Sequence, residues 1–209
     1  MDETSQSARK HQAILDAARS VFLRKGYGGA SMDEVAAQAA VSKQTVYKHF
    51  ADKRRLFEAI ITNDISATES LTHDMVASLS ATDDLEHDLR QFARGHIDEV
   101  TQPHLIQLRR IIIAEADRFP DLAKSWFANG PERAHATLAA QFQELERRGL
   151  LTVPDPVLAA QHFNWLVLSI PLNKAMFHPD HKTPRRELNH YADEAVRIFL
   201  AAYAAEPNT

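Results

Sequence analysis

The stretch SMDEVAAQAAVSKQTVYKHFADK, residues 31–53, decides the fold of this chain. Ser31 and Glu34 form a capping box, the arrangement that begins a helix when such residues stand three apart. Apolar residues then recur at helical spacing as far as Ala39, which predicts a first short helix. Ser42 is placed to cap a second one. The stretch therefore predicts two short helices joined by a tight turn.

The turn consists of Ala40 and Val41, with Val41 pointing inward. A positive φ at Ala40 would cost on the order of 1 kcal/mol, because its Cβ crowds the backbone in that conformation. Asp52 is placed to cap a third helix, which we expect to run toward Ser80. Lys53 in its first turn is electrostatically disfavoured. A DNA phosphate nearby would remove this conflict; the alternative is that the side chain is solvated.

The second short helix is rich in hydrogen-bonding side chains and poor in acidic ones. Val46 and Phe50 stand four residues apart and form its apolar face, with Tyr47 beside them. The side chains left to face outward are Lys43, Gln44, Thr45, Lys48 and His49. A helix that enters a DNA groove needs this composition.

This block resembles the DNA-binding domain of the TetR family of bacterial transcription regulators. The family pattern is filled in register by Ser31, Val35, Ala36, Ala39, Val41, Ser42, Val46, Tyr47, His49, Phe50 and Lys53. The likeness extends over roughly residues 8 to 62, because Ile14 to Ala18 and Leu56 to Ile60 also match. Ala40 stands where the family usually has glycine, and Gln44 where glycine is frequent.

The resemblance implies two roles for the residues of the second short helix and its flanks, namely phosphate contacts and base contacts. Phosphates are usually held in the family by the positions that match Ser31, Ser42, Tyr47, His49 and Lys53. Base edges are reached from the positions that match Lys43, Gln44, Thr45 and Lys48.

Composition narrows the protein class. The 209 residues include no cysteine, which excludes a disulfide framework and a thiolate metal site. No apolar run approaches the ~20 residues of a membrane span, and the polar N-terminus does not match a signal peptide. We therefore expect a cytoplasmic protein. The net charge is −4, but residues 1–60 hold 10 Lys/Arg and 7 Asp/Glu, a net +3 that leaves −7 elsewhere. A basic segment on an acidic body suits DNA held at one end.

Beyond the first 60 residues the sequence predicts further helices and no strand of useful length. Their expected ranges are 82–100, 103–119, 121–129, 131–148, 157–177 and 184–204. Thr82 is expected to cap the first of these, Gly130-Pro131 to end the third, and Gly149 to stop the fourth. The fold class is therefore all-α.

The segment from Arg109 to Gly149 resembles, more loosely, the ligand-binding half of TetR regulators of the AefR-like type. That resemblance implies an inducer pocket and a dimer interface made by the last two long helices. Helix 157–177 is apolar nearly all round, as expected if its own core covers one side and a partner the other. The alternative is a central core helix in a monomer. Leu168 and Phe199 are expected in the dimer contact, and Pro171 is expected to kink its helix.

A small-molecule site would use polar or aromatic side chains on otherwise apolar faces. The candidates are Phe92, His96, Arg109, Glu115, Trp126, Phe127, His162, Trp165 and Met176. For each of them alone, core packing or a satisfied core hydrogen bond is the more common role, but as a set they are consistent with a largely apolar cavity. The densest histidine group, His178-Pro179-Asp180-His181, lies in a predicted loop without the spacing of a zinc site, so we expect no metal and no cofactor.

These features lead to one hypothesis, one main alternative and a third option, a sequence-independent DNA binder, which the acidic body disfavours. Residues 1–52 are expected to form a three-helix helix-turn-helix domain, and residues 53–209 a helical ligand-binding and dimerisation domain. The protein would be a transcriptional repressor that binds a palindromic DNA operator as a homodimer and is released by a small-molecule effector, with no membrane partner. The alternative is a helical small-molecule-binding protein or enzyme whose helix-turn-helix is non-functional; no catalytic motif favours an enzyme.

Overall fold

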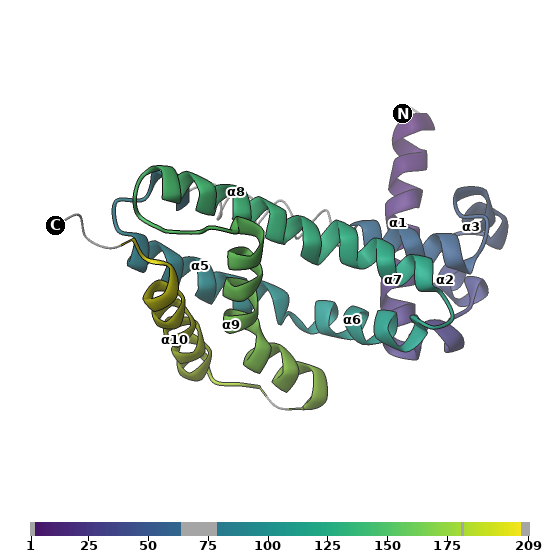
Figure 1. Cartoon of the computed structure of the whole chain (residues 1–209). Helices are drawn as coiled ribbons and strands as arrows, with labels where there is room; N and C mark the ends of the chain where they lie inside the picture. Colours follow the sequence, from purple (N-terminus) through teal and green to yellow (C-terminus); the bar gives the residue numbers. More distant parts are fainter. Residues whose placement is uncertain (1–2, 64–78, 181, 206–209) are drawn as a thin grey trace. The chain divides into compact units, whose positions relative to one another are not determined.

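The computed structural model describes residues 3–63, 79–180 and 182–205 (Figure 1). Within these residues the structure is helical, apart from one isolated antiparallel bridge between Leu151 and Ala204, so the all-α prediction is confirmed. Its contacts divide the chain into two compact units. Unit 1 comprises Met1–Ser66 with Gln107–Trp126, and unit 2 comprises Ala67–Ile106 with Phe127–Thr209. A domain boundary between residues 52 and 53 stays a prediction.

Unit 1 holds the N-terminal helices and a segment from the middle of the chain. Its elements are α1 (Glu3–Gly29), α2 (Met32–Gln38), α3 (Lys43–His49), a helix from residue 53 that is described to residue 63, most of α6 (Pro103–Glu115) and α7 (Pro120–Phe127). Phe22 and Phe57 are fully buried at the centre of its core, with ring centroids 4.9 Å apart. Leu108 and Ile112 of α6 and Leu122 of α7 join the same core.

Three helices of unit 1 begin directly after the capping residues that the sequence predicts. The Ser31 hydroxyl accepts a hydrogen bond from the backbone N–H of Glu34 at 3.2 Å, and the Ser42 hydroxyl accepts one from Thr45 at 3.1 Å. The Asp52 carboxylate accepts one from the backbone N–H of Arg55 at 2.8 Å. All three predicted caps are thus confirmed. The Glu34 carboxylate binds Arg24 and Lys25 of α1, each at 2.8 Å, and so ties α2 to α1.

The turn between α2 and α3 is a Schellman motif. The Ala40 N–H donates to Ala37 at 3.2 Å, and the Val41 N–H donates to Ala36 at 3.1 Å. Ala40 occupies the position that usually holds glycine, and its φ is 53°. The positive φ considered from the sequence is therefore present, with its cost in strain.

Unit 2 is a bundle built around α9. Its elements are η1 (Leu79–Ala81), α5 (Leu85–Val100), η2 (Ala128–Glu132), α8 (Arg133–Arg147), α9 (Pro156–Phe177) and α10 (Arg185–Tyr203). Helix α9 packs against α5, α8 and α10 (Figure 1). Phe142, Phe163 and Phe199 meet at the centre, with centroids 5.0–5.8 Å apart, and all three are fully buried.

Several helix ends in unit 2 match the sequence and others do not. Gly149 has a φ of 73° and closes α8 as expected. The predicted cap Thr82 is wrong: Asp84 caps α5, and the buried Thr82 hydroxyl accepts the Asp84 N–H at 3.0 Å. Gly130-Pro131 was also expected to end a helix, but the π-helical turn η2 carries the chain directly into α8.

Two expected helix features are only partly described. The helix from Asp52 was expected to reach Ser80, but residues 64–78 lie outside the described residues, and 79–81 form η1. The kink expected at Pro171 stays a prediction, although α9 is assigned as one helix through that residue. Among the described residues no helix combines the length and the apolarity that a membrane crossing requires.

Replacing Ala40 by glycine should stabilise unit 1 by up to about 1 kcal/mol, because glycine adopts a φ of 53° without strain. Urea denaturation followed by tryptophan fluorescence measures this, in a Trp165→Phe background that leaves Trp126 of unit 1 as the reporter. The matched control is Ala37→Gly, inside α2, which should destabilise by about 1 kcal/mol. Equal destabilisation by both changes would contradict the strain at Ala40.

Candidate nucleic-acid interface

Helix α3 presents a polar face and is anchored by an apolar one. Lys43, Gln44 and Lys48 are exposed, and so is Tyr47, with half of its surface accessible. The apolar face consists of Val46, which is fully buried, and of Phe50, which directly follows the helix and is also buried. Because the anchor fixes the rotation of the helix, the side chains expected to reach base edges point away from the core. We call α3 the recognition helix.

The exposed side chains of the recognition helix differ in their partners. Lys43 forms an ion pair with Asp33 at 2.5 Å, and the hydroxyls of Ser42 and Thr45 are 2.8 Å apart. Gln44 and Lys48 make no hydrogen bond or ion pair within the described part of the chain. An exposed ion pair is worth at most about 1 kcal/mol, so Lys43 can exchange Asp33 for a phosphate or a base at little cost.

His49, at the end of α3, lies against an aromatic neighbour from α1. The ring centroids of His49 and His11 are 5.5 Å apart, and His11 stacks on Phe50 at 4.9 Å. Burial lowers the pKa of His49, and nearby positive charges lower it further. Those charges belong to His11, Lys48 and Lys10.

Lys53 has partners that the sequence did not suggest. Its ammonium group donates to the carbonyl oxygens of Tyr27 at 2.9 Å and Ala30 at 3.0 Å, and lies 4.6 Å from the centre of the Tyr27 ring. The side chain is partly buried, so it is not simply solvated. The carbonyl groups at the end of α1 supply the negative charge that offsets a cation at a helix N-terminus. A lysine has three N–H donors, and two of them are used here.

Three of the candidate ligand-binding residues belong to unit 1, together with the recognition helix. The Arg109 guanidinium lies over the Trp126 ring, 4.8 Å from its centre, and burial lowers the pKa of Arg109. Glu115 lies 3.9 Å from Arg118 in the same unit. These contacts suit packing of α6 and α7 onto the core of unit 1.

Two other candidates meet inside unit 2. Phe92 and His96 stack with their centroids 5.6 Å apart, and the His96 Nε2 lies 2.9 Å from the Asn164 side-chain oxygen. That oxygen only accepts hydrogen bonds, so Nε2 carries the proton and Nδ1 is an acceptor. Nδ1 is buried and has no hydrogen-bond partner among the described residues. Burial lowers the pKa of His96, which keeps the ring neutral and able to accept a hydrogen bond.

The remaining candidates do not converge on His96. Trp165 and Phe127 are each nearly half exposed, and His162 is exposed with its Nδ1 2.6 Å from the Tyr203 hydroxyl. Met176 packs, partly buried, against the core of unit 2. Leu168 and Phe199, which were expected to face a partner, are instead buried in the core of the protomer, so that expectation is wrong.

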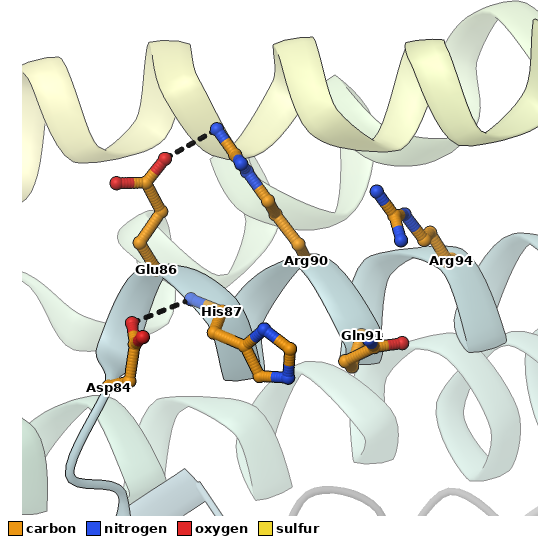
Figure 2. A pocket seen from close by; sticks show the side chains of 6 residues that line it. All are labelled: Asp84, Glu86, His87, Arg90, Gln91 and Arg94. Atoms are coloured by element: carbon orange, nitrogen blue, oxygen red, sulfur yellow. Dashed lines mark hydrogen bonds and ion pairs between the residues drawn. The ribbon is translucent and has the colours of Figure 1, made fainter.

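A hollow of about 340 Å³ lies along the first half of α5 and was not predicted from the sequence. Its lining residues are Asp84, Glu86, His87, Arg90, Gln91 and Arg94 (Figure 2). Figure 2 shows Glu86 and Arg90 reaching one another as an ion pair. Arg94 pairs with Asp193 of α10 through two hydrogen bonds, at 2.9 and 2.8 Å. The charges of this hollow are therefore largely neutralised by the protein itself. Only the spacing of polar residues on α5 could have indicated it.

No cluster of three or more histidine, aspartate or glutamate side chains suited to a metal ion occurs in the described residues. Of the group at residues 178–181, His181 lies outside the described residues.

Comparison with known proteins matches both the N-terminal and the C-terminal part of the chain to known families. Residues 14–60 match the family described as bacterial regulatory proteins, tetR family. Residues 87–205, more than half of the chain, match the family described as AefR-like transcriptional repressor, C-terminal domain.

Individual relatives agree with these matches. A protein from Mesorhizobium loti MAFF303099, described as a TetR-family transcriptional regulator, is 43% identical and superposes with a TM-score of 0.91 over 95% of this chain and 98% of its own. The flavonoid-responsive regulator FrrA is 29% identical, with a TM-score of 0.76 over 97% and 100% of the two chains. The transcriptional activator FasR of Mycolicibacterium smegmatis is 34% identical over 85 residues, which span 41% of this chain and 37% of FasR.

Replacing Lys53 by methionine should lower the free energy of unfolding of unit 1 by about 1–3 kcal/mol, because two carbonyl groups lose a charged donor. Urea denaturation in the Trp165→Phe background measures the change. Arg55→Met is the control on the same helix: its exposed ion pair with Glu58 should be worth less than about 1 kcal/mol. If Lys53→Met were as stable as the control and only weakened DNA binding, Lys53 would act through phosphate alone.

Proposed function

The chain belongs to the TetR family of bacterial regulatory proteins, with a C-terminal domain of the AefR-like type, and we propose on that premise that it is a repressor that binds a palindromic operator as a homodimer and is released by a small ligand. The observation that carries the DNA-binding part is the recognition helix. Its apolar side is fixed in the core, and its opposite side is polar and free of acidic residues. Such a helix fits the major groove, where paired donors and acceptors identify bases. We place this activity in the cytoplasm.

The proposed roles of the nine DNA-binding residues follow the family positions. Gln44 and Lys48, which have no partner in the described residues, and Lys43 and Thr45 would reach base edges. The phosphate contacts would come from Ser31, Ser42, Tyr47, His49 and the third N–H of Lys53. Phosphate contacts fix the position of the helix on the duplex, while base contacts choose the sequence.

The dimer is supported by apolar side chains left exposed on the last two helices. On α9 these include Leu158, Trp165 and Ile170, each between 44% and 49% exposed, and on α10 Ile198 is 44% exposed. Their neighbours on the other side of each helix are buried in the core of unit 2. A second copy of the same face would cover these residues in a two-fold arrangement. The apolar character of α9 all round is then explained, as expected from the sequence.

Two protomers supply two recognition helices, which must be about 34 Å apart, or a multiple of this distance, to occupy successive major grooves on one side of DNA. An effector can release the DNA only if it binds more tightly to a conformation in which this spacing is lost. The small ligand thus acts through its preference between two states of the dimer.

The effector is proposed to bind in unit 2 at Phe92 and His96. The buried Phe92 ring stacks on His96, and the buried Nδ1 of neutral His96 can accept a hydrogen bond from a ligand hydroxyl. FrrA, which is flavonoid-responsive by name, is similar over its whole length. A hydroxylated aromatic molecule is accordingly the effector class that we propose.

Trp165→Glu and Ile198→Glu should each dissociate the dimer, because a charge would be buried without a partner at a cost of several kcal/mol. Sedimentation equilibrium measures the dissociation constant. The control is Ile113→Glu, which changes a more exposed apolar residue on α6 in unit 1 and should leave the dimer intact. A wild-type protein that sediments as a monomer at micromolar concentration would refute the dimer. A Trp165→Glu variant that stays dimeric would show that Trp165 lies outside the interface and would leave it as a candidate ligand-binding residue.

The direct test of DNA binding is a gel shift with the DNA upstream of the protein's own gene. Wild type should shift it, and hydroxylated aromatic compounds should reverse the shift. Gln44→Ala should relax the preference at one base pair by roughly 1–3 kcal/mol, because its side chain amide reaches a base edge. Binding to duplexes that differ at single positions measures this loss. If Gln44→Ala weakens binding to all duplexes alike, Gln44 does not contact a base. If wild type binds no duplex, the protein is better explained as one whose helix-turn-helix is non-functional.

A further inference from the structure

The start of α1 lies beside the end of the recognition helix. His11 stacks on Phe50 with an interplanar angle of 29° and meets the His49 ring edge-on. Ser7, Lys10 and His11 share one side of α1, because they are spaced by three and four residues. Ser7 and Lys10 are exposed, and His11 is only partly buried. The side of α1 that contacts α3 therefore continues outward as a polar surface.

The charges gathered at this place are all of one sign. The described groups that act on His49 are Lys10 and His11 from α1 and Lys48 from its own helix, and all three disfavour its protonation. The nearest acidic residue along α1, Asp16, interacts with Gln12 and Arg19. Lys43, at the other end of α3, is by contrast paired with Asp33. Like charges that have no carboxylate partner among the described residues are unfavourable in the free protein and become favourable once an anion binds between them.

We propose that Lys10 and His11 form, with His49, a phosphate-binding corner through which α1 contacts the DNA backbone beside the groove entered by α3. This inference rests on the proposed DNA-binding function and adds α1 to the interface. Stacking on Phe50 positions the His11 ring, and a protonated histidine donates from both ring nitrogens. The anion is one backbone phosphate of duplex DNA.

Proton uptake is linked to this contact. A bound phosphate favours the charged form of His49, so complex formation raises the pKa of His49 from its lowered position in the free protein. The protein then takes up protons on binding, and its affinity for DNA increases as the pH falls toward the pKa of free His49, which lies below the usual histidine value. One proton taken up per protomer gives at most about a tenfold gain in affinity per pH unit.

The test uses the full-length protein and the upstream duplex bound in the gel shift, with affinity measured against salt and pH by fluorescence anisotropy. Lys10→Ala should weaken binding about fivefold at roughly 0.15 M salt and reduce the salt slope by about 0.9 per protomer, as expected for one lost phosphate contact. His11→Phe keeps the stacking on Phe50 and removes the ring nitrogens, so it should weaken binding and alter its pH dependence, because His11 is one of the groups that act on His49. Lys124→Ala on α7 is the control of equal charge and should behave like wild type.

Sequence preference gives a further readout, since a phosphate contact does not change it. If wild type binds the duplex but Lys10→Ala and His11→Phe keep its salt slope and pH dependence, the corner does not exist and His11 only packs. The exposed Lys10 can be removed without disturbing the core, so this outcome stays decisive even if His11→Phe unfolds. Inorganic phosphate that competes at millimolar concentration with wild type and not with Lys10→Ala would support the same site. Failure of wild type to bind any duplex would overturn the proposed function itself.

Discussion

The hydrogen bonds from Lys53 to the carbonyl groups of Tyr27 and Ala30 are the constraint on which the DNA-binding unit depends. They join the end of α1 to the start of the helix that follows the recognition helix. The helix-turn-helix lies between these two points, so both of its ends are fixed. Charged hydrogen bonds are among the stronger polar contacts in proteins, and partial burial protects this pair from solvent. The exposed face of α3 can then consist of polar residues that contribute little to stability.

The local features of the fold could be predicted because their signals lie within a few residues. Ser31, Ser42 and Asp52 each accept a hydrogen bond from the backbone N–H three residues later, and these caps can be predicted from the sequence. Gly149 and Ala40 mark Schellman turns in the same way. The prediction that Thr82 caps α5 was wrong because Asp84, two residues further on, is the better placed cap. Neither the partners of Lys53, more than 20 residues away, nor the stack of His11 on Phe50 could be found from local spacing.

The candidate sites in unit 2 were harder to predict for a physical reason. Helix α9 is apolar all round, so its sequence does not say which side faces the core. Leu168 proved to be buried and Trp165 exposed, the reverse of the roles expected for them. An aromatic residue suits a ligand site, a core and an interface equally well. Only the contacts of the folded unit separate these roles, and they leave Phe92 and His96 as the pair that meets around an unpartnered buried nitrogen.

The central claim is that two copies of the recognition helix read one duplex together. Selection of bound sequences from a pool of randomised duplexes by the full-length protein tests it most directly, because the selected sites record the symmetry of the complex. The account predicts an inverted repeat whose two half-sites are centred about one helical turn, or a multiple of it, apart. Enrichment of a single asymmetric site, or of no sequence at all, would contradict it.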